Sequence, residues 1–120
     1  MLRAVALCCA VLGTPAAAQT LLERVQGIYV PQGMEAFWDC QSLGQDGGAL
    51  AIRGTEMIGV ENTCQLKSPD PIPGMDAVRY SRSCAGEGMT YEGDPVILTP
   101  TDGGVGILYS GFVTEWRRCP

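Results

Sequence analysis

Apolar and polar residues follow a helical pattern only in the segment "TLLERVQG", near the beginning of the chain. Thr20 and Glu23 have the spacing of a capping box, in which each side chain accepts a hydrogen bond from the other residue's backbone N–H. Gly27 suits the left-handed residue that ends a helix. We therefore expect a helix over residues 21–26, which must pack on the rest of the fold because it is so short. Its apolar face would carry Leu22 and Val25.

After this segment the apolar residues recur at a period of two, which is typical of strands. Branched and aromatic residues gather in short runs separated by turn residues: IYV, AFWDC, ALAIR, EMIGV, CQLK, AVRYSRSC, PVILT, VGILY and FVTEW. Asp-Gly turns in QDGG (residues 45–48) and TDGG (101–104) predict two hairpins. The proline-rich segment SPDPIPG (68–74) predicts a stiff extended loop rather than an inner strand, because proline lacks the N–H that a sheet requires.

This arrangement predicts an all-β fold with one short N-terminal helix and two disulfides. We expect a small antiparallel β-barrel or sandwich of about seven or eight short strands. The helix would either plug one end or pack on the outside.

The beginning of the chain has the composition of a cleaved signal peptide. Arg3 supplies a positive charge, residues 4–12 are apolar but too few to span a bilayer as a helix, and small residues follow. We expect cleavage before Gln19, so that residues 1–18 are removed and residues 19–120 form one disulfide-bonded domain. An uncleaved anchor is the alternative. Export would place the protein in the periplasm or outside the cell, with no stable membrane insertion.

The cysteines support an oxidising compartment. Cleavage would remove Cys8 and Cys9 and leave an even number in the domain, which is typical of exported disulfide-bonded proteins. The pairing that we expect is Cys40–Cys64 with Cys84–Cys119, and a nested arrangement with Cys64–Cys84 is the alternative. A four-cysteine zinc site is disfavoured because the chain has no C-x-x-C pair.

Charge and composition exclude several classes of function. The chain has 8 basic and 13 acidic residues, a net charge of −5, and no histidine. An acidic protein is repelled by nucleic acid and by anionic lipid. The absence of histidine removes the Ser-His and Cys-His catalytic arrangements and the usual zinc and copper sites. We therefore expect no catalytic residues, no metal and no cofactor. A pair of carboxylates acting as in glycosidases is the enzymatic alternative, but no spacing singles out a pair.

Five residues are the candidates for a binding site. In AVRYSRSC, alternation places Tyr80 and Arg82 on one face of a strand and Arg79 on the other. An inward-facing Arg82 needs a carboxylate partner or a route to solvent, and in a barrel mouth it could bind a ligand carboxylate through two hydrogen bonds. Glu87 is a candidate partner for it, as is Glu61. Trp38 would either pack beside a disulfide or mark a binding surface.

The order of several short motifs resembles a group of small secreted bacterial proteins whose activity is uncharacterised. The shared features are W-x-C, I-x-x-x-x-I-x-x-x-E-x-x-C, C-x-x-E-G and a terminal R-C. Here the second motif falls on Ile52, Ile58 (shifted by one position), Glu61 and Cys64. The resemblance covers most of residues 36–119 and implies a four-cysteine β-domain without implying an activity.

A second resemblance is to the C-type lysozyme inhibitors of the bacterial envelope. Their S-G-x-R-Y segment and aromatic-x-x-G strand are similar to AVRYS and YEGDPVIL, although Asp76 and Ala77 replace the serine and glycine. An acidic barrel would attract a basic lysozyme. Our expectation is a non-enzymatic module that binds an unknown protein or small ligand at the cell envelope. Lysozyme inhibition and a structural accessory role in an envelope complex are the alternatives.

Overall fold

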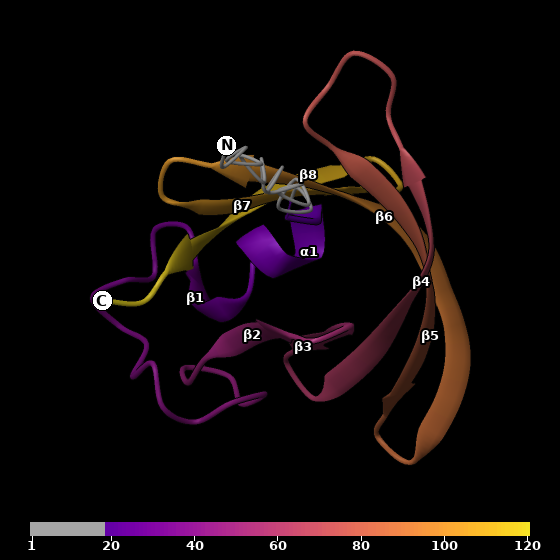
Figure 1. Cartoon of the computed structure of the whole chain (residues 1–120). Helices are drawn as coiled ribbons and strands as arrows, with labels where there is room; N and C mark the ends of the chain where they lie inside the picture. Colours follow the sequence, from indigo (N-terminus) through magenta and orange to yellow (C-terminus); the bar gives the residue numbers. More distant parts are fainter. Residues whose placement is uncertain (1–18) are drawn as a thin grey trace, which may run out of the picture.

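The chain folds into a closed antiparallel β-barrel, as Figure 1 shows for the computed structural model, which describes residues 19–120. The expected signal peptide lies outside the described residues. One short helix, α1 (Leu21–Arg24), precedes the strands. The strands are β1 (Gly27–Pro31), β2 (Leu50–Arg53), β3 (Glu56–Gly59), β4 (Asn62–Pro71), β5 (Val78–Gly86), β6 (Met89–Thr101), β7 (Gly104–Tyr109) and β8 (Phe112–Arg118). The all-β prediction is therefore confirmed in its barrel form.

Each strand pairs with its neighbours in the chain, and β8 pairs with β1 to close the barrel. In this closing pair Tyr29 lies opposite Arg118 and Pro31 lies opposite Trp116. Because the strands alternate in direction, the turns after β3, β5 and β7 lie at one end of the barrel. We call this end the mouth. The turns after β2, β4 and β6 lie at the other end, together with α1.

The helix carries the predicted capping box but ends earlier than expected. The Thr20 side chain accepts from the backbone N–H of Glu23, and the Glu23 side chain accepts from that of Thr20. The expected extent and helix-ending role of Gly27 are wrong, because the helix ends at Arg24 and Gly27 instead begins β1. In Figure 1 the helix lies inside the ring of strands, so it plugs one end of the barrel.

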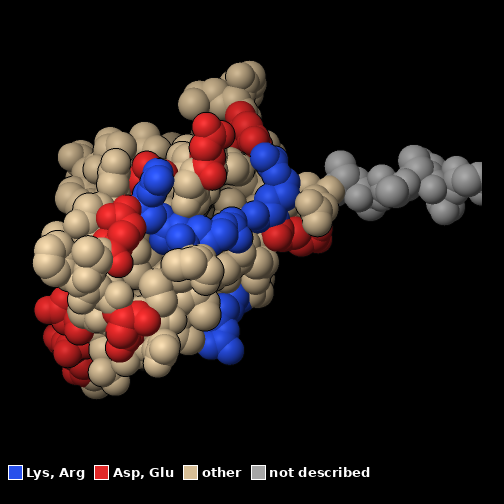
Figure 2. All heavy atoms as spheres, turned by 90° about the vertical axis from the view of Figure 1, so that its left-hand side faces the viewer, with Lys and Arg blue, Asp and Glu red and all other residues tan. Residues whose placement is uncertain are grey.

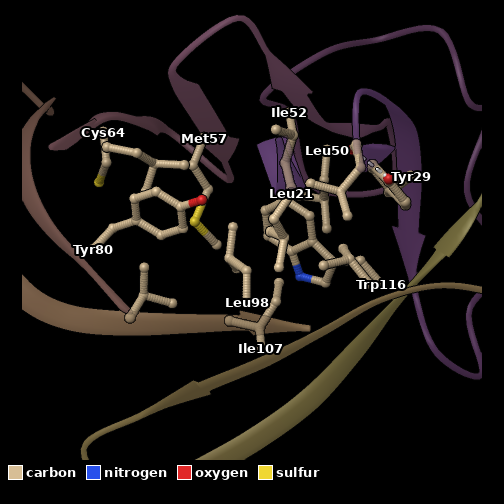
Figure 3. Packing of buried hydrophobic residues seen from close by; sticks show 14 of the residues in the cluster. Leu21, Tyr29, Leu50, Ile52, Met57, Cys64, Tyr80, Leu98, Ile107 and Trp116 are labelled. Atoms are coloured by element: carbon tan, nitrogen blue, oxygen red, sulfur yellow. Dashed lines mark hydrogen bonds between the residues drawn. The ribbon is translucent and has the colours of Figure 1, made fainter. Parts of the chain in front are cut away.

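The interior of the barrel is filled by apolar side chains from α1 and from most strands. Leu21 and Val25 are the buried residues of the helical segment, whereas Leu22 packs against their cluster from a partly exposed position. Figure 3 shows Met57, Leu98 and Ile107 pointing into the same interior. Burying each such side chain contributes about 1.5–3 kcal/mol. Among the described residues no polar or charged residue is buried in this core.

Tyr29 is the largest fully buried side chain and connects three elements. Its hydroxyl donates to the carbonyl of Val25 at 2.5 Å and accepts from Nη2 of Arg118 at 3.2 Å. The Arg118 guanidinium also lies 5.3 Å from the centre of the Tyr29 ring. These contacts fasten α1 to β1 and β8, at the seam where the barrel closes.

Two segments expected to form strands or hairpins are irregular. The AFWDC segment is a turn, in which the carbonyl of Met34 accepts from the backbone N–H groups of Phe37 and Trp38. Asp39 then accepts from the N–H groups of Gln41 and Ser42, which bends the chain further. QDGG is also a turn, but no strand precedes it, so only TDGG forms the predicted hairpin, between β6 and β7.

The proline-rich segment belongs partly to a strand, which corrects its interpretation as a loop. Strand β4 continues through Pro69 to Pro71, where it pairs with Val78 of β5. A register shift between Lys67 and Asp70 interrupts the pairing, and Ser68 adopts a positive φ of 52° there. Because the prolines follow this irregularity, the regular part of β4 keeps the backbone N–H groups that donate hydrogen bonds to its neighbours.

The expected pairing of the cysteines, Cys40–Cys64 with Cys84–Cys119, is wrong. The structure has the nested arrangement, in which Cys40 is bonded to Cys119 and Cys64 to Cys84. Cys64 and Cys84 lie directly opposite each other on β4 and β5. Cys64 lies near the start of β4 and Cys84 near the end of β5, so this antiparallel hairpin brings the two residues to the same end of the barrel. Two disulfides indicate an oxidising, extracytoplasmic environment.

Candidate functional site

A cavity of about 340 Å³ opens at the mouth of the barrel. We call it the mouth pocket, and the residues that determine its chemistry are Trp38, Met57, Asn62, Arg82, Tyr109 and Trp116. They come from the loop after β1 and from strands β3, β4, β5, β7 and β8. The barrel closure therefore brings together residues that are distant in the chain.

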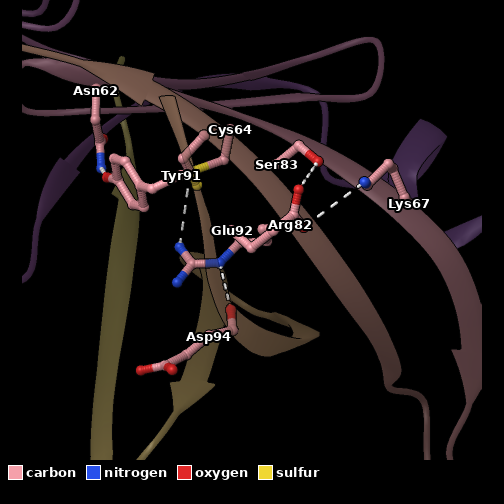
Figure 4. Close-up of a disulfide and its surroundings, with 9 residues drawn as sticks. Asn62, Cys64, Lys67, Arg82, Ser83, Tyr91, Glu92 and Asp94 are labelled. Atoms are coloured by element: carbon pink, nitrogen blue, oxygen red, sulfur yellow. Dashed lines mark hydrogen bonds and ion pairs between the residues drawn. A yellow bond between two sulfur atoms is a disulfide. The ribbon is translucent and has the colours of Figure 1, made fainter. Parts of the chain in front are cut away.

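Arg82 is the only basic residue among the described residues that line the mouth pocket. Figure 4 shows its guanidinium beside the Cys64–Cys84 disulfide. Its Nε donates to the backbone carbonyl of Asp94 at 2.7 Å, and its Nη1 lies 4.0 Å from Sγ of Cys64. Its Cζ lies 5.4 Å from the centre of the Tyr109 ring, within the range of a cation–π interaction.

The local backbone explains why an arginine fits at this position. Alternation along β5 places Arg82 on the inner face with Tyr80 and Cys84, as predicted. The pairing with β6 shifts register between Tyr80 and Arg82, so that Arg82 lies opposite Gly93. A Cβ at Gly93 would lie 3.2 Å from Nη2 of Arg82 and 3.0 Å from Sγ of Cys84. The glycine therefore leaves room for the guanidinium and the disulfide together.

The expected carboxylate partners of Arg82 do not reach it. Within residues 19–120, Arg82 forms no ion pair with Glu61, Glu87 or any other acidic residue. The side chain is partly exposed through the mouth, which is the alternative that the sequence allowed. Its outer nitrogens, Nη1 and Nη2, are thus available to a ligand on the side of the cavity, since Nη2 makes no hydrogen bond with the described residues.

Aromatic side chains form much of the remaining wall. Trp116 is buried and its ring centre lies 6.1 Å from that of Tyr29, whereas Trp38 is partly exposed. Tyr109 lies between Arg82 and Phe112, whose ring centre is 5.2 Å from its own. An arginine among aromatic rings suits a ligand with a negatively charged group next to an apolar one.

The other three predicted site residues lie elsewhere. Arg79 is exposed on the outer face of β5, and Tyr80 is buried in the core at 3 % exposure. Burial raises the pKa of Tyr80 above its ordinary value. Glu87 lies in the exposed turn between β5 and β6 with a positive φ of 51°. The structure therefore brings Arg82 and Trp38 together and separates them from Arg79, Tyr80 and Glu87.

Residues that the sequence analysis did not single out complete the site. Asn62 donates through Nδ2 to the hydroxyl of Tyr91 at 3.2 Å, which links the mouth pocket to β6. Tyr109 is the last residue of β7. The run VGILY predicted a strand there, but it did not indicate that the Tyr109 ring would lie against an arginine. Gly93 had no sequence signal because its role depends on the register between β5 and β6.

Several of the remaining charged side chains form ion pairs on the surface. Figure 2 shows a band of basic side chains across one face with acidic side chains on both sides. Arg24 pairs with Asp76 at 2.7 Å, and Arg117 pairs with Glu115 at 2.9 Å. The hydrogen bond from Arg24 holds the pKa of Asp76 below its ordinary value. The mouth pocket differs because its lining holds an arginine and, among the described residues, no acidic side chain.

Across residues 19–120, no three His, Cys, Asp or Glu side chains are grouped so that they could hold a metal ion. No helix in the same range has the length and apolarity needed to cross a membrane.

Comparison of the chain with protein-family models, with curated proteins and with solved structures found no match. The resemblances noted from the sequence therefore stay predictions.

Proposed function

We propose that this protein is a non-enzymatic binding module at the cell envelope, located in the periplasm or outside the cell. Its mouth pocket binds a ligand that carries a carboxylate next to an apolar or aromatic body. The observation that carries the proposal is Arg82, whose outer nitrogens face a cavity without an acidic partner among the described residues.

The electrostatics of the pocket favour an anion. An arginine binds a carboxylate through two parallel hydrogen bonds, and such charge-assisted bonds are about twice as strong as neutral ones. The bond from Nε of Arg82 to the carbonyl of Asp94 fixes the guanidinium in one orientation, while Tyr109 lies against it. The group is therefore held in place before the ligand arrives, which reduces the entropy lost on binding.

The size and lining of the cavity favour a small ligand group. Its volume of about 340 Å³ lies at the lower end of the range for small-molecule sites. Met57, Trp38 and Trp116 provide apolar contacts. The lining contributes no histidine, free thiol or carboxylate among the described residues, so it offers binding groups and not a general base or a nucleophile.

Tryptophan fluorescence tests this proposal directly, because both tryptophans of the chain line the pocket. Titration with phenylacetate should change the emission, whereas 2-phenylethanol, which lacks the carboxylate, should bind at least tenfold more weakly. The variant Arg82→Gln should lose this preference. Arg79→Gln is the matched control, since Arg79 lies on the same strand but faces outward. Equal binding of the acid and the alcohol, or no dependence on Arg82, would overturn the proposal.

Inhibition of a muramidase is the second candidate, supported by the net charge of −5, which would attract a basic enzyme. The AVRYS segment presents Arg79 to solvent but buries Tyr80, so an inhibitory contact would use the arginine without its neighbour. Micromolar protein should slow lysis of bacterial cell walls by lysozyme, and Arg79→Gln should weaken the effect. Unchanged lysis would exclude this candidate.

A further inference from the structure

The exposed apolar side chains are concentrated at the mouth end. The described residues include ten large apolar side chains with high exposure. Ile28 and Met75 lie near the α1 end, since Ile28 is the second residue of β1 and Met75 lies in the turn after β4. The others belong to the loop after β1 or flank the turns at the mouth: Met34, Phe37, Val60, Met89, Tyr91, Leu108, Phe112 and Val113. Exposed apolar groups concentrated at one end of a molecule indicate an interaction surface.

This surface is wider than the mouth pocket. Phe37 and Val113 are 77 % and 73 % exposed, and neither lines the cavity. A second hollow of about 340 Å³ lies on the outer side of Tyr109, between Arg79 and Phe112. A ligand that fills only the mouth pocket would leave these side chains in water. A partner that covers them as well must be a macromolecule.

Acidic residues at the same end favour a polypeptide over an anionic membrane. Glu61 and Glu87 lie in adjacent turns, because the pairing of Thr63 with Ala85 continues toward them. Both are exposed, and neither forms an ion pair with another described residue. The turns adjoin Asn62 of the mouth pocket, since a Cβ at Gly86 would lie 3.0 Å from the Cβ of Asn62. Two carboxylates repel anionic lipid and attract a basic segment.

The closed form of the pocket restricts how a polypeptide can enter. Leu50 and Met57 line the cavity and also belong to the packed core, and α1 plugs the far end of the barrel. A chain can therefore enter the mouth but cannot pass through. A C-terminus satisfies this restriction and supplies a carboxylate for Arg82.

We propose that the mouth end binds the C-terminus of a partner polypeptide. The terminal carboxylate pairs with Arg82, and the terminal apolar side chain packs among Trp38, Tyr109 and Trp116. A basic residue a few positions upstream lies over Glu61 and Glu87, and apolar residues contact the exposed side chains around the mouth. This inference rests on the proposed function, because it assigns the carboxylate ligand of the same pocket to a polypeptide.

Peptide titrations monitored by NMR of the two tryptophan indole N–H groups test the proposal. The probe is acetyl-Lys-Ser-Ala-Phe with a free C-terminal carboxylate. We expect its C-terminal amide to bind at least tenfold more weakly, and a version with Ser in place of Lys to bind about threefold more weakly. Arg82→Gln should abolish the first difference. The double variant E61Q/E87Q should abolish only the difference between the Lys and Ser peptides. Asp70→Asn is the control, because Asp70 is an exposed acid in the part of β4 near the α1 end, and it should change neither difference.

Each outcome separates this inference from the proposed function. If phenylacetate binds through Arg82 but the peptide acid and its amide bind equally, the C-terminus proposal is wrong and the proposed function stands. Preference for a peptide with an internal glutamate and an amidated end would replace the terminus with a side-chain carboxylate. Binding to phosphatidylglycerol vesicles in place of peptides would identify the exposed apolar side chains as a membrane surface. If neither phenylacetate nor peptide binds, both proposals are wrong.

Discussion

The disulfide between Cys40 and Cys119 should supply a large part of the stability of the barrel. The two residues are separated by 79 positions, so the bond joins the loop after β1 to the end of β8. Both are only partly buried. Replacing them in the variant C40A/C119A therefore removes the crosslink without opening a large cavity in the core.

The expected loss follows from the entropy of loop closure. Cys64 and Cys84, separated by 20 positions, form the inner crosslink, which shortens the outer loop by that number of residues. The effective outer loop is then roughly 60 residues long, and closing a loop of that length is worth about 4 kcal/mol in the chain-entropy model. Small domains have a free energy of unfolding of about 5–15 kcal/mol, so this is a substantial fraction.

Urea unfolding followed by tryptophan fluorescence, under non-reducing conditions, measures this loss. We expect the free energy of unfolding of C40A/C119A to fall by about 4 kcal/mol. We also expect the free energy of unfolding to fall more steeply with urea concentration, because the unfolded chain is less restricted and exposes more surface. A loss below about 1.5 kcal/mol with an unchanged slope would refute the reasoning, since it would mean that the crosslink scarcely restricts the unfolded chain.

Three further predictions follow from single side chains. Tyr29→Phe should lower the free energy of unfolding by about 1–2 kcal/mol in urea titrations, because the carbonyl of Val25 loses its buried donor. Burial raises the pKa of Tyr29 in the folded protein, so the neutral phenol contributes stability that is fully present below the ordinary tyrosine pKa. The free energy of unfolding of the original protein should therefore decline as the pH rises through the folded pKa, and that of Tyr29→Phe should decline less steeply. Asp76→Asn should flatten the acid side of the pH–stability profile, because the lowered pKa of Asp76 contributes stability that is lost as the pH falls through its folded value. Gly93→Ala should weaken phenylacetate binding while both disulfides still form in mass spectrometry, because the added methyl group displaces Arg82.

The fold was predictable because its signals are local. Alternation in AVRYSRSC placed Arg82 inside and Arg79 outside, and the capping box marked the beginning of α1. Short strands separated by turn residues favour antiparallel pairing between neighbours, which is the pairing that the barrel has along its whole circumference. Local rules were sufficient because, within residues 19–120, the strands follow one another around the barrel in chain order.

The disulfide pairing was not predicted from the same signals, because it depends on the register of β4 with β5 and on the path of the loop after β1. Prolines normally end a strand, and the continuation of β4 to Pro71 required an irregularity at Ser68 that no short motif announces. The register of β4 and β5 places Cys84 opposite Cys64, and the bond of Cys40 to Cys119 depends on the path of the irregular loop after β1, where a strand was expected. Arg79 and Tyr80 lie on opposite faces of β5 because neighbouring residues on a strand alternate, so these two candidates cannot belong to one site.

The position of Arg82 depends both on local alternation and on strand register. Alternation determines that its side chain points inward, but only the register with β6 determines what it meets there. Had β6 paired without its shift, a residue with a Cβ could have stood opposite, and the guanidinium would have had less room beside the Cys64–Cys84 bond. The crosslink, the register shift and the glycine act together to hold one cation at the rim of an apolar interior. Burying an unpaired cation without water is costly, and Arg82 avoids this cost because it is partly exposed at the open mouth. Its guanidinium can therefore still pair with an anionic group of a ligand.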